Sequence, residues 1–269
     1  MRLKIRWKIS ISVMAVLVVI LAYNVVFGKL LPYSPVAIGF EKHEMDHTIV
    51  YVADGSNFKD FEKFDMLLGP VEAFHQLKFL RKPKIYIFSD KAEYYRRTIT
   101  RARFCTYPNG DIVVAPWAIT DADSGNISLE IYLTHELSHT ILYQNMGVLA
   151  AYHFPQWLME GTAVYSANQM GTSFYPDKQR TYQAIRDGVY FPPELFKTKR
   201  ENEINLDIEN PIAFKYSEFG CIVDYLVLKY GKDRFIDYLK LLIENENYKD
   251  AFKIIYHSDI DIELEDFKK

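Results

Sequence analysis

Thr134-His135-Glu136-Leu137-Ser138-His139-Thr140 is the stretch around which the rest of the chain is organised. On an α-helix, His135 and His139 lie about 40° apart around the axis and one turn apart along it, so both imidazoles project from one face. Two imidazoles with that spacing can bind a single Zn²⁺ ion, and the carboxylate of Glu136 then reaches a water at the metal. The pattern alone arises by chance in roughly one chain per hundred of this length, so the remaining sequence has to supply a helix and a third ligand.

The motif is predicted to lie on a helix that begins near Ser128 and ends before Gly147, because apolar residues recur on one face and glycine often ends helices. The apolar positions are Leu129, Tyr132, Leu133, Leu137, Ile141 and Leu142. A second helix is predicted from Pro155, a residue favoured in a first helical turn, to about Asn168. Both histidines are therefore expected on one helix, with another helix directly after it.

Glu160, on the second helix, is the candidate third ligand, since a catalytic zinc site uses three protein ligands and an open position. It follows His139 by 21 residues, with Trp157 and Leu158 before it and Gly161 after it. Glycine inside a helix costs about 1 kcal/mol relative to alanine, which indicates a close approach that excludes a side chain. Considered alone, Glu160 would be interpreted as one exposed helix carboxylate among the 35 acidic residues of the chain.

The segments before and after these helices predict one α+β domain over residues 42–269: a small mixed sheet with helices, followed by a mainly helical C-terminal half. Strands are predicted at 47–53 and 84–89, helices at 58–79 and 90–99, and a hairpin of 103–107 with 111–115 around Pro108-Asn109-Gly110. Gly69-Pro70 is a potential break in the first of those helices. Later helices are predicted at 177–187, 211–230, 232–244 and 248–257.

Composition excludes one class of function. The chain has 269 residues, 49% hydrophobic and 15% aromatic, which is ample for a core, and its net charge is −3. Four of its 32 basic residues lie among the first eight positions, so the remainder carries 28 basic and 35 acidic residues, a net charge of −7. That balance argues against a nucleic-acid-binding surface. The four basic residues are Arg2, Lys4, Arg6 and Lys8.

Residues 9–27 carry no charge and, as a helix, span roughly 28 Å, about one hydrocarbon core. Four positive charges precede them and Lys29 follows, so the positive-inside rule predicts a cytoplasmic tail at 1–8. A cleaved signal peptide is the alternative, but the apolar run continues past Ala22, the one plausible residue before a cut. We predict an uncleaved transmembrane signal anchor over 9–27, a single-pass protein of the cell membrane with its main domain extracytoplasmic, and a linker at 28–41.

Cysteines and the remaining histidines give no further metal site. Cys105 and Cys221 form either one disulfide or two buried free thiols, and the sequence leaves both open. The other histidines show no metal-type pairing and are interpreted as surface or packing residues. They are His43, His47, His75, His153 and His257.

His-Glu-x-x-His followed by Pro155-x-Trp-Leu-x-Glu160-Gly-x-Ala-x-Tyr resembles the gluzincin zinc metallopeptidases, in particular the small peptidase-MA-like domains of bacterial membrane and secreted proteins. The resemblance covers roughly residues 47–267. It extends to the segment from Tyr216 to Leu226, to Lys229-Tyr230-Gly231, to Leu241-Leu242, and to Ile260–Phe267. It implies a zincin-like fold with one Zn²⁺ per chain, held by His135, His139 and Glu160, with Glu136 as general base.

The resemblance also implies a donor for the tetrahedral oxyanion, taken from a helix after the third ligand. Tyr216 is the first choice and Tyr165 the second. The chain has 20 tyrosines, and either of these two also suits a core position. Where some gluzincins place an aspartate that orients a histidine, this chain has Val164, so the orienting partner stays open and a backbone carbonyl is one candidate. The strand at 111–115 is either a plain hairpin strand or the sheet edge that binds an extended substrate.

The function expected from these features is zinc-dependent hydrolysis of peptide bonds in a peptide or protein substrate, with membrane contact through residues 9–27 and no nucleic-acid partner. Two alternatives stay open. One is a non-catalytic binding or scaffold module on a peptidase-like fold, and the other is a zinc hydrolase that cleaves cell-wall amides. Specificity depends on pocket walls that motif spacing does not reveal.

Overall fold

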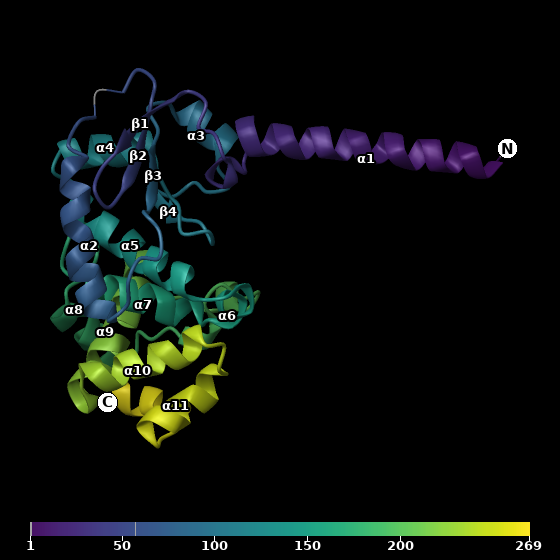
Figure 1. Cartoon of the computed structure of the whole chain (residues 1–269). Helices are drawn as coiled ribbons and strands as arrows, with labels where there is room; N and C mark the ends of the chain where they lie inside the picture. Colours follow the sequence, from purple (N-terminus) through teal and green to yellow (C-terminus); the bar gives the residue numbers. More distant parts are fainter. Residues whose placement is uncertain (1, 57) are drawn as a thin grey trace.

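One five-stranded mixed sheet forms the first half of the domain (Figure 1). The structure, a computed structural model, describes residues 2–56 and 58–269, with side chains described at 12–56, 58–147 and 149–269. The strand order is β1-β2-β3-β5-β4, with parallel pairing of β2 with β3 and β3 with β5, and antiparallel pairing at both edges. The strands are β1 (Phe40–Glu44), β2 (Ile49–Ala53), β3 (Lys84–Ile87), β4 (Phe104–Thr106) and β5 (Ile112–Val114).

Both faces of the sheet are covered, because successive side chains of a strand point to opposite faces. In β5, Ile112 and Val114 belong to the main core with the large helices, whereas Val113 belongs to a smaller cluster on the other face. That second cluster includes Tyr86 of β3 and Leu31, which is fully buried. The inner strands are therefore apolar on both sides, as expected for parallel strands.

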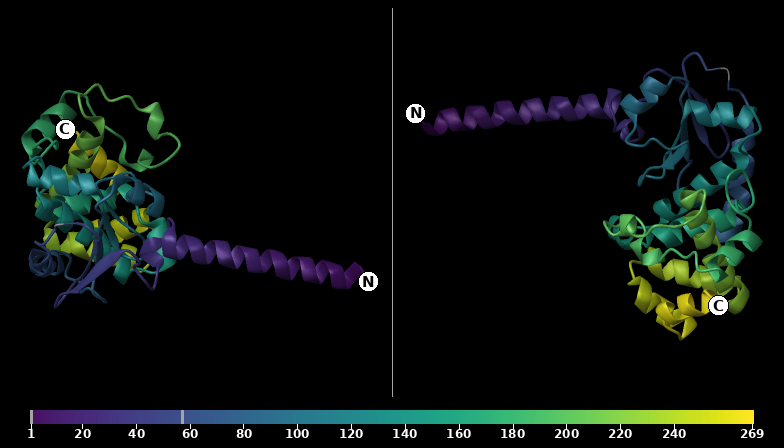
Figure 2. Two further views of the ribbon diagram at one scale, coloured as in Figure 1. Left: turned by 90° about the horizontal axis from the view of Figure 1, so that it is seen from above. Right: turned by 180° about the vertical axis from the view of Figure 1, so that it is seen from behind.

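Helices surround the sheet and form the second half of the chain (Figures 1 and 2). Before the motif lie α1 (Arg2–Phe27), α2 (Glu62–His75), α3 (Lys91–Arg97) and α4 (Pro116–Asp123). The central helices are α5 (Leu129–Asn145), α6 (Val148–His153) and α7 (Gln156–Ser166). The C-terminal helices are α8 (Lys178–Arg186), α9 (Pro211–Tyr230), α10 (Lys232–Ile243), α11 (Tyr248–Tyr256) and α12 (Ile260–Phe267).

The predicted fold class is confirmed: a small mixed sheet with helices precedes a helical C-terminal half. Pro70 lies inside α2, which stays one helix. One strand and three α-helices were not predicted, namely β1, α4, α6 and α12. β1 is an edge strand without a fully buried residue, and α4, α6 and α12 have only 8, 6 and 8 residues, so each is too short for a clear apolar period.

The N-terminal prediction needs a correction. Helix α1 projects away from the rest of the chain (Figures 1 and 2). Among the residues that the structure describes, no helix is both long enough and apolar enough to cross a membrane. On this finding, the transmembrane anchor at 9–27 and the single-pass membrane location are wrong.

The predicted linker at 28–41 is also part of the folded domain. Leu31 is fully buried, and η1 (Leu31–Tyr33), a 3₁₀ turn, and the start of β1 lie within it. The arginines of α3 bind the C-terminal carbonyls of α1: Arg96 donates to Phe27 O at 2.8 Å and Arg97 to Val26 O at 3.1 Å. The side chains of the predicted tail at 1–8 lie outside the described residues.

Helices α7 and α9 cross at unusually close range, which fixes the position of α7, the helix that contains Glu160. A Cβ atom on Gly161 would lie 2.5 Å from Phe219 O, and one on Gly220 would lie 2.7 Å from Val164 Cγ1. Neither distance is tolerated between non-bonded heavy atoms, so both positions require glycine. The close approach predicted from Gly161 is therefore confirmed.

Candidate metal centre

Helix α5 carries the motif through the middle of the domain. Ser128 caps its N-terminus, because Ser128 Oγ accepts from Ile131 N at 3.3 Å. The helix packs against α2, α7 and β4, and every residue from His135 to Leu142 is buried. Two histidines are thus held on a rigid helix inside the protein, where their side chains have little freedom.

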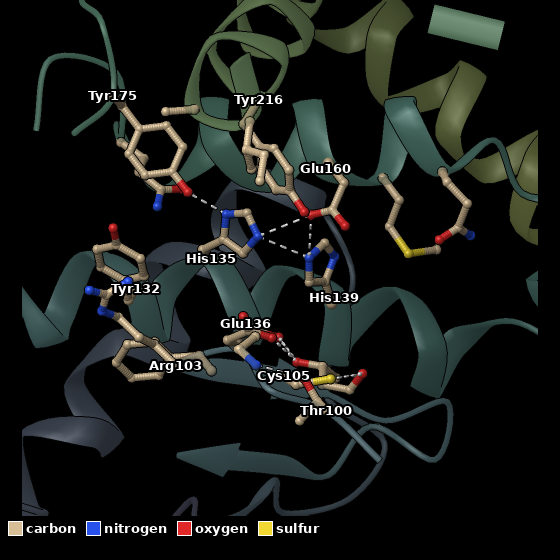
Figure 3. A pocket seen from close by; sticks show the side chains of 18 of the residues that line it. Thr100, Arg103, Cys105, Tyr132, His135, Glu136, His139, Glu160, Tyr175 and Tyr216 are labelled. Carbon is tan, nitrogen blue, oxygen red and sulfur yellow. Dashed lines mark hydrogen bonds and ion pairs between the residues drawn. The ribbon is translucent and has the colours of Figure 1, made fainter. Parts of the chain in front are cut away.

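Three potential ligand atoms converge on one point (Figure 3). His135 Nε2 lies 3.0 Å from His139 Nε2, and Glu160 Oε2 lies 3.3 Å from the first and 3.2 Å from the second. All three side chains are buried. The structure therefore brings together the three predicted ligands, two from α5 and one from α7.

The donor set fits zinc. In a tetrahedral site with metal–ligand distances of about 2.0–2.1 Å, neighbouring ligand atoms lie roughly 3.3 Å apart. The three separations here, 3.0 to 3.3 Å, match that value closely. Two imidazoles and one carboxylate are a typical catalytic zinc set.

Gln169 orients the first histidine. Its Oε1 lies 2.8 Å from His135 Nδ1 and can only accept, so the Nδ1–H donates and the Nε2 lone pair is left for a metal. The partner left open by the sequence is thus a side-chain amide, and Val164 instead packs against α9 at Gly220. His139 Nδ1 is buried, and no described group bonds to it.

Glu160 is a carboxylate held from two sides. Its Oε2 faces the imidazoles, and its Oε1 accepts from Lys197 Nζ at 2.9 Å. Burial raises the pKa of Glu160, but His139, His135 and Lys197 outweigh it, so the pKa lies well below its ordinary value. The pKa of His135 is raised, since burial lowers it less than Glu160 and Glu136 raise it. Glu160 is therefore ionised and ready to bind a cation.

Glu136 lies on the sheet side of the ligands. Thr106 of β4 donates from Oγ1 to Glu136 Oε2 at 2.6 Å, and the same hydroxyl lies 3.0 Å from Glu136 O. This contact fixes the carboxylate of the predicted general base beside the sheet edge. Figure 3 shows Glu136 below the two histidines, near Cys105.

The two tyrosine candidates lie in different places. Tyr216 of α9 is beside Glu160 (Figure 3), and its ring centroid is 6.4 Å from that of His135. Burial, followed by the charge of Glu160, raises the pKa of Tyr216 well above its ordinary value. Tyr165 lines another surface hollow, between Phe74 and Lys178. The first choice is therefore at the candidate site and the second is not.

A cavity of about 620 Å³ opens at the ligands, between the sheet and the helical half of the chain. Its size suits a peptide-sized ligand. Lining residues include Thr106, Cys105, Tyr175, Lys197 and Tyr216, together with the three ligands and Glu136. The catalytic candidates thus share one solvent-reachable cavity.

The sheet edge at this cavity is β4 rather than the predicted strand at 111–115. That strand, β5, pairs with β3 on one side and β4 on the other, so it has no free edge. Of the two alternatives for 111–115, the substrate-binding edge is therefore wrong and the plain hairpin strand is confirmed, and β4 is the strand at the edge of the sheet. The hairpin pattern defines the pairing of two strands but not which of them finds a third neighbour.

Both cysteines are free thiols. Cys105 lies in β4 at the cavity, and Cys221 is buried in α9, where its Sγ lies 3.6 Å from Met170 Sδ. Of the other histidines, His75 is buried, His43 is half-buried against Phe61, and the rest are exposed, so all are packing or surface residues as predicted. The rest are His47, His153 and His257.

Sequence reasoning missed Gln169, Thr106 and Lys197. Each acts from outside the two motif helices: a loop after α7, the edge strand and the long segment before α9. None follows a spacing that relates it to the histidines, and their contacts depend on how distant segments meet. No motif in the sequence was available to find them.

No protein-family model matches the chain, and no curated protein matches it. The likeness to gluzincins thus rests on the motif residues themselves.

Proposed function

We propose that this protein is a zinc-dependent hydrolase of peptide (amide) bonds, with His135, His139 and Glu160 as ligands. One observation carries the proposal: three buried ligand atoms lie 3.0 to 3.3 Å apart at the wall of a cavity, with a further carboxylate beside them. A zinc ion bound there would polarise a carbonyl group and bring the pKa of water toward neutrality. The resemblance to gluzincins supports the same assignment.

Glu136 is the general base in this proposal. Its carboxylate is next in sequence to a ligand, and Thr106 holds one of its oxygens at 2.6 Å, so the other is free to take a proton from water. After attack on the carbonyl carbon, Glu136 passes that proton to the leaving amine. General acid–base catalysis of this kind contributes about 10²–10⁴-fold to a rate.

Tyr216 supplies a hydrogen-bond donor for the oxyanion. Its raised pKa keeps the hydroxyl protonated at neutral pH, so it donates to an oxygen that becomes negative during the reaction. Its position beside Glu160 places that donor at the ligand cluster.

The edge strand β4 offers a place for an extended substrate. Arg103 O accepts from Ala115 N and Tyr107 N donates to Asp111 O, so the odd-numbered residues of the strand face β5. By the alternation of a strand, the backbone groups of Phe104 and Thr106 then face outward, toward a substrate strand. Thr106 also holds Glu136, which ties the substrate edge to the base.

The test combines metal analysis with the base variant Glu136→Gln. We expect about one zinc per chain in freshly purified protein, and hydrolysis of a broad peptide library. Glu136→Gln should keep the zinc and lower kcat/KM by at least about 100-fold. Glu130→Gln, an exposed position in the first turn of the same helix, is the matched control and should be unchanged.

Three results count against the proposal. If freshly purified wild-type protein contains no zinc, the proposed metal centre is wrong. If the wild type binds zinc but cleaves no peptide, the result favours a binding module or a hydrolase of other amides. Full activity in Glu136→Gln would show that another group is the base. A parallel assay on cell-wall amides separates the two hydrolase substrates.

A further inference from the structure

The segment 187–210, which joins α8 to α9, lies beside the candidate metal centre. It is fixed on α9 at two points. Phe191 N donates to the buried Glu218 carboxyl group, at 3.2 and 3.1 Å from its two oxygens. The ring of Phe196 packs edge-on against Tyr216 and Phe219, with centroids 5.9 and 5.0 Å away. Lys197, which directly follows Phe196, is therefore held close to the ligands.

The backbone of Lys197 adopts a conformation that few side chains accept. Its φ is +57°, in the left-handed region that residues other than glycine rarely adopt. Lys197 N donates to Glu201 Oε2 at 2.8 Å, and Glu201 is in turn ion-paired with Lys215. A strained position supported by its own contacts is typical of functional sites.

The Lys197 ammonium group reaches two oxygens on α7. Its Nζ donates to Glu160 Oε1 at 2.9 Å and to Gln156 Oε1 at 3.3 Å. The side chain is 47% exposed, whereas that of Glu160 is 9% exposed. The two oxygens of Glu160 are thus divided: Oε2 faces the imidazoles and Oε1 faces the ammonium.

We infer that Lys197 is a positioning residue for the metal centre, which restricts Glu160 to binding through one oxygen. The inference rests on the proposed function, because it concerns the same zinc site. A carboxylate with both oxygens free can take two coordination positions, and a catalytic site needs one position open. An ammonium bound to Oε1 competes for that oxygen and fixes the plane of the carboxylate.

The inference is tested by metal binding rather than by turnover. Lys197→Met removes the ammonium, Lys197→Arg keeps a cation, and Lys197→Gln is a polar second replacement. Lys199→Met, at an exposed position of the same segment, is the matched control for loss of one positive charge. Zinc affinity is measured by competition with a chromophoric chelator. Visible absorption of the Co²⁺-substituted protein reports coordination number, because four-coordinate Co²⁺ absorbs more strongly than five-coordinate Co²⁺.

We expect the zinc affinity of Lys197→Met and Lys197→Gln to differ from that of the wild type by at least about 10-fold, the size of effect found for partners that orient ligands. Their Co²⁺ bands should lose intensity, while Lys197→Arg and Lys199→Met stay close to wild type. The loss of the ammonium beside the buried carboxylate of Glu160 should also lower the melting temperature of the metal-free variants, so the Co²⁺ spectrum is the deciding measurement. A merely structural role would change that temperature and leave the Co²⁺ spectrum alone.

The possible failures are distinguishable. Wild-type protein that binds no zinc overturns the proposed function and this inference together. Tight zinc binding by the wild type, with unchanged affinity and Co²⁺ spectrum in Lys197→Met, overturns the inference and leaves the proposed function standing. An equal change of zinc affinity in Lys199→Met also overturns it, since the effect would then be a general one of charge.

Discussion

The two buried sides of helix α5 both carry histidine contacts, yet they differ in chemistry. Toward α2, Ser138 Oγ donates to His75 Nε2 at 2.9 Å, and His75 Nδ1 donates to Val71 O at 2.9 Å. Toward α7, His135 and His139 direct their Nε2 atoms at each other and at Glu160. His75 has a partner for each nitrogen as a neutral side chain, whereas the other pair faces the buried carboxylate of Glu160.

This difference shows that burial of a histidine does not identify a metal ligand. His75 has one partner for each nitrogen and no carboxylate, so burial lowers its pKa to about 4 and keeps it neutral. The pair on the other side has a buried carboxylate within 3.3 Å, which a divalent cation would neutralise. The arrangement of acceptors, and not the residue type, makes the second side the candidate centre.

The largest expected effect separates the two sides by metal affinity. His139→Ala should weaken zinc binding on the order of 1,000-fold, because a total zinc-binding free energy of about 10–16 kcal/mol is shared among few ligands. His75→Gln, which keeps polar atoms on the other side, should leave the affinity near that of wild type. Competition with a chelator measures both, and similar losses in the two variants would contradict the comparison.

The next effect is the pH dependence of stability from His75. Its pKa is about 4 in the folded protein and about 6.5 when unfolded, so the unfolded state binds more protons between these values. The stabilisation is therefore present above pH 6.5 and is lost as the pH falls toward 4, by up to about 3 kcal/mol at roughly 1.36 kcal/mol per unit.

Urea unfolding of the metal-free protein at several pH values measures that loss. The double variant His75→Leu/Ser138→Ala replaces both side chains of the hydrogen bond by apolar ones. Its free energy of unfolding should therefore depend less on pH over this range than that of the wild type. If the double variant and the wild type lose stability in parallel, the assignment to His75 is incorrect.

The smallest effect tests the orienting amide. Gln169→Leu removes the acceptor for His135 Nδ1–H and should weaken zinc binding by about 10-fold. Gln169→Glu keeps an acceptor at that place and should bind zinc more tightly than the leucine variant. Equal affinities in wild type and Gln169→Leu would show that His135 keeps its orientation without this bond.

Much of the fold and the three candidate ligands could be predicted because they depend on local patterns. The apolar period of α5, the proline at the start of α7 and the glycine at 161 all act within one helix or between sequence neighbours. The hairpin of β4 and β5 was likewise marked by its turn residues. Tyr216 could be placed by the gluzincin resemblance, and the structure places it beside Glu160.

The errors occurred where a segment's neighbours decide its role. Residues 28–41 were assigned as a linker from glycines and prolines, yet Leu31 is buried on the sheet. The apolar run at 9–27 predicted a membrane anchor, and no described helix meets the requirement for one. The strand at 111–115 was a candidate edge, but β3 lies along its other side. Hydropathy and turn signals do not report which partner a segment meets.

The sequence by itself determined that His135 and His139 share one face of a helix, because helical geometry relates positions four apart. It also indicated the close approach at Gly161, because a glycine inside a helix is otherwise unfavourable. Only the tertiary structure decided that Gln169 orients one histidine, that Thr106 holds Glu136, and that Lys197 reaches Glu160. The physical reason is that these bonds join segments far apart in sequence, whose contacts exist only after the chain has packed.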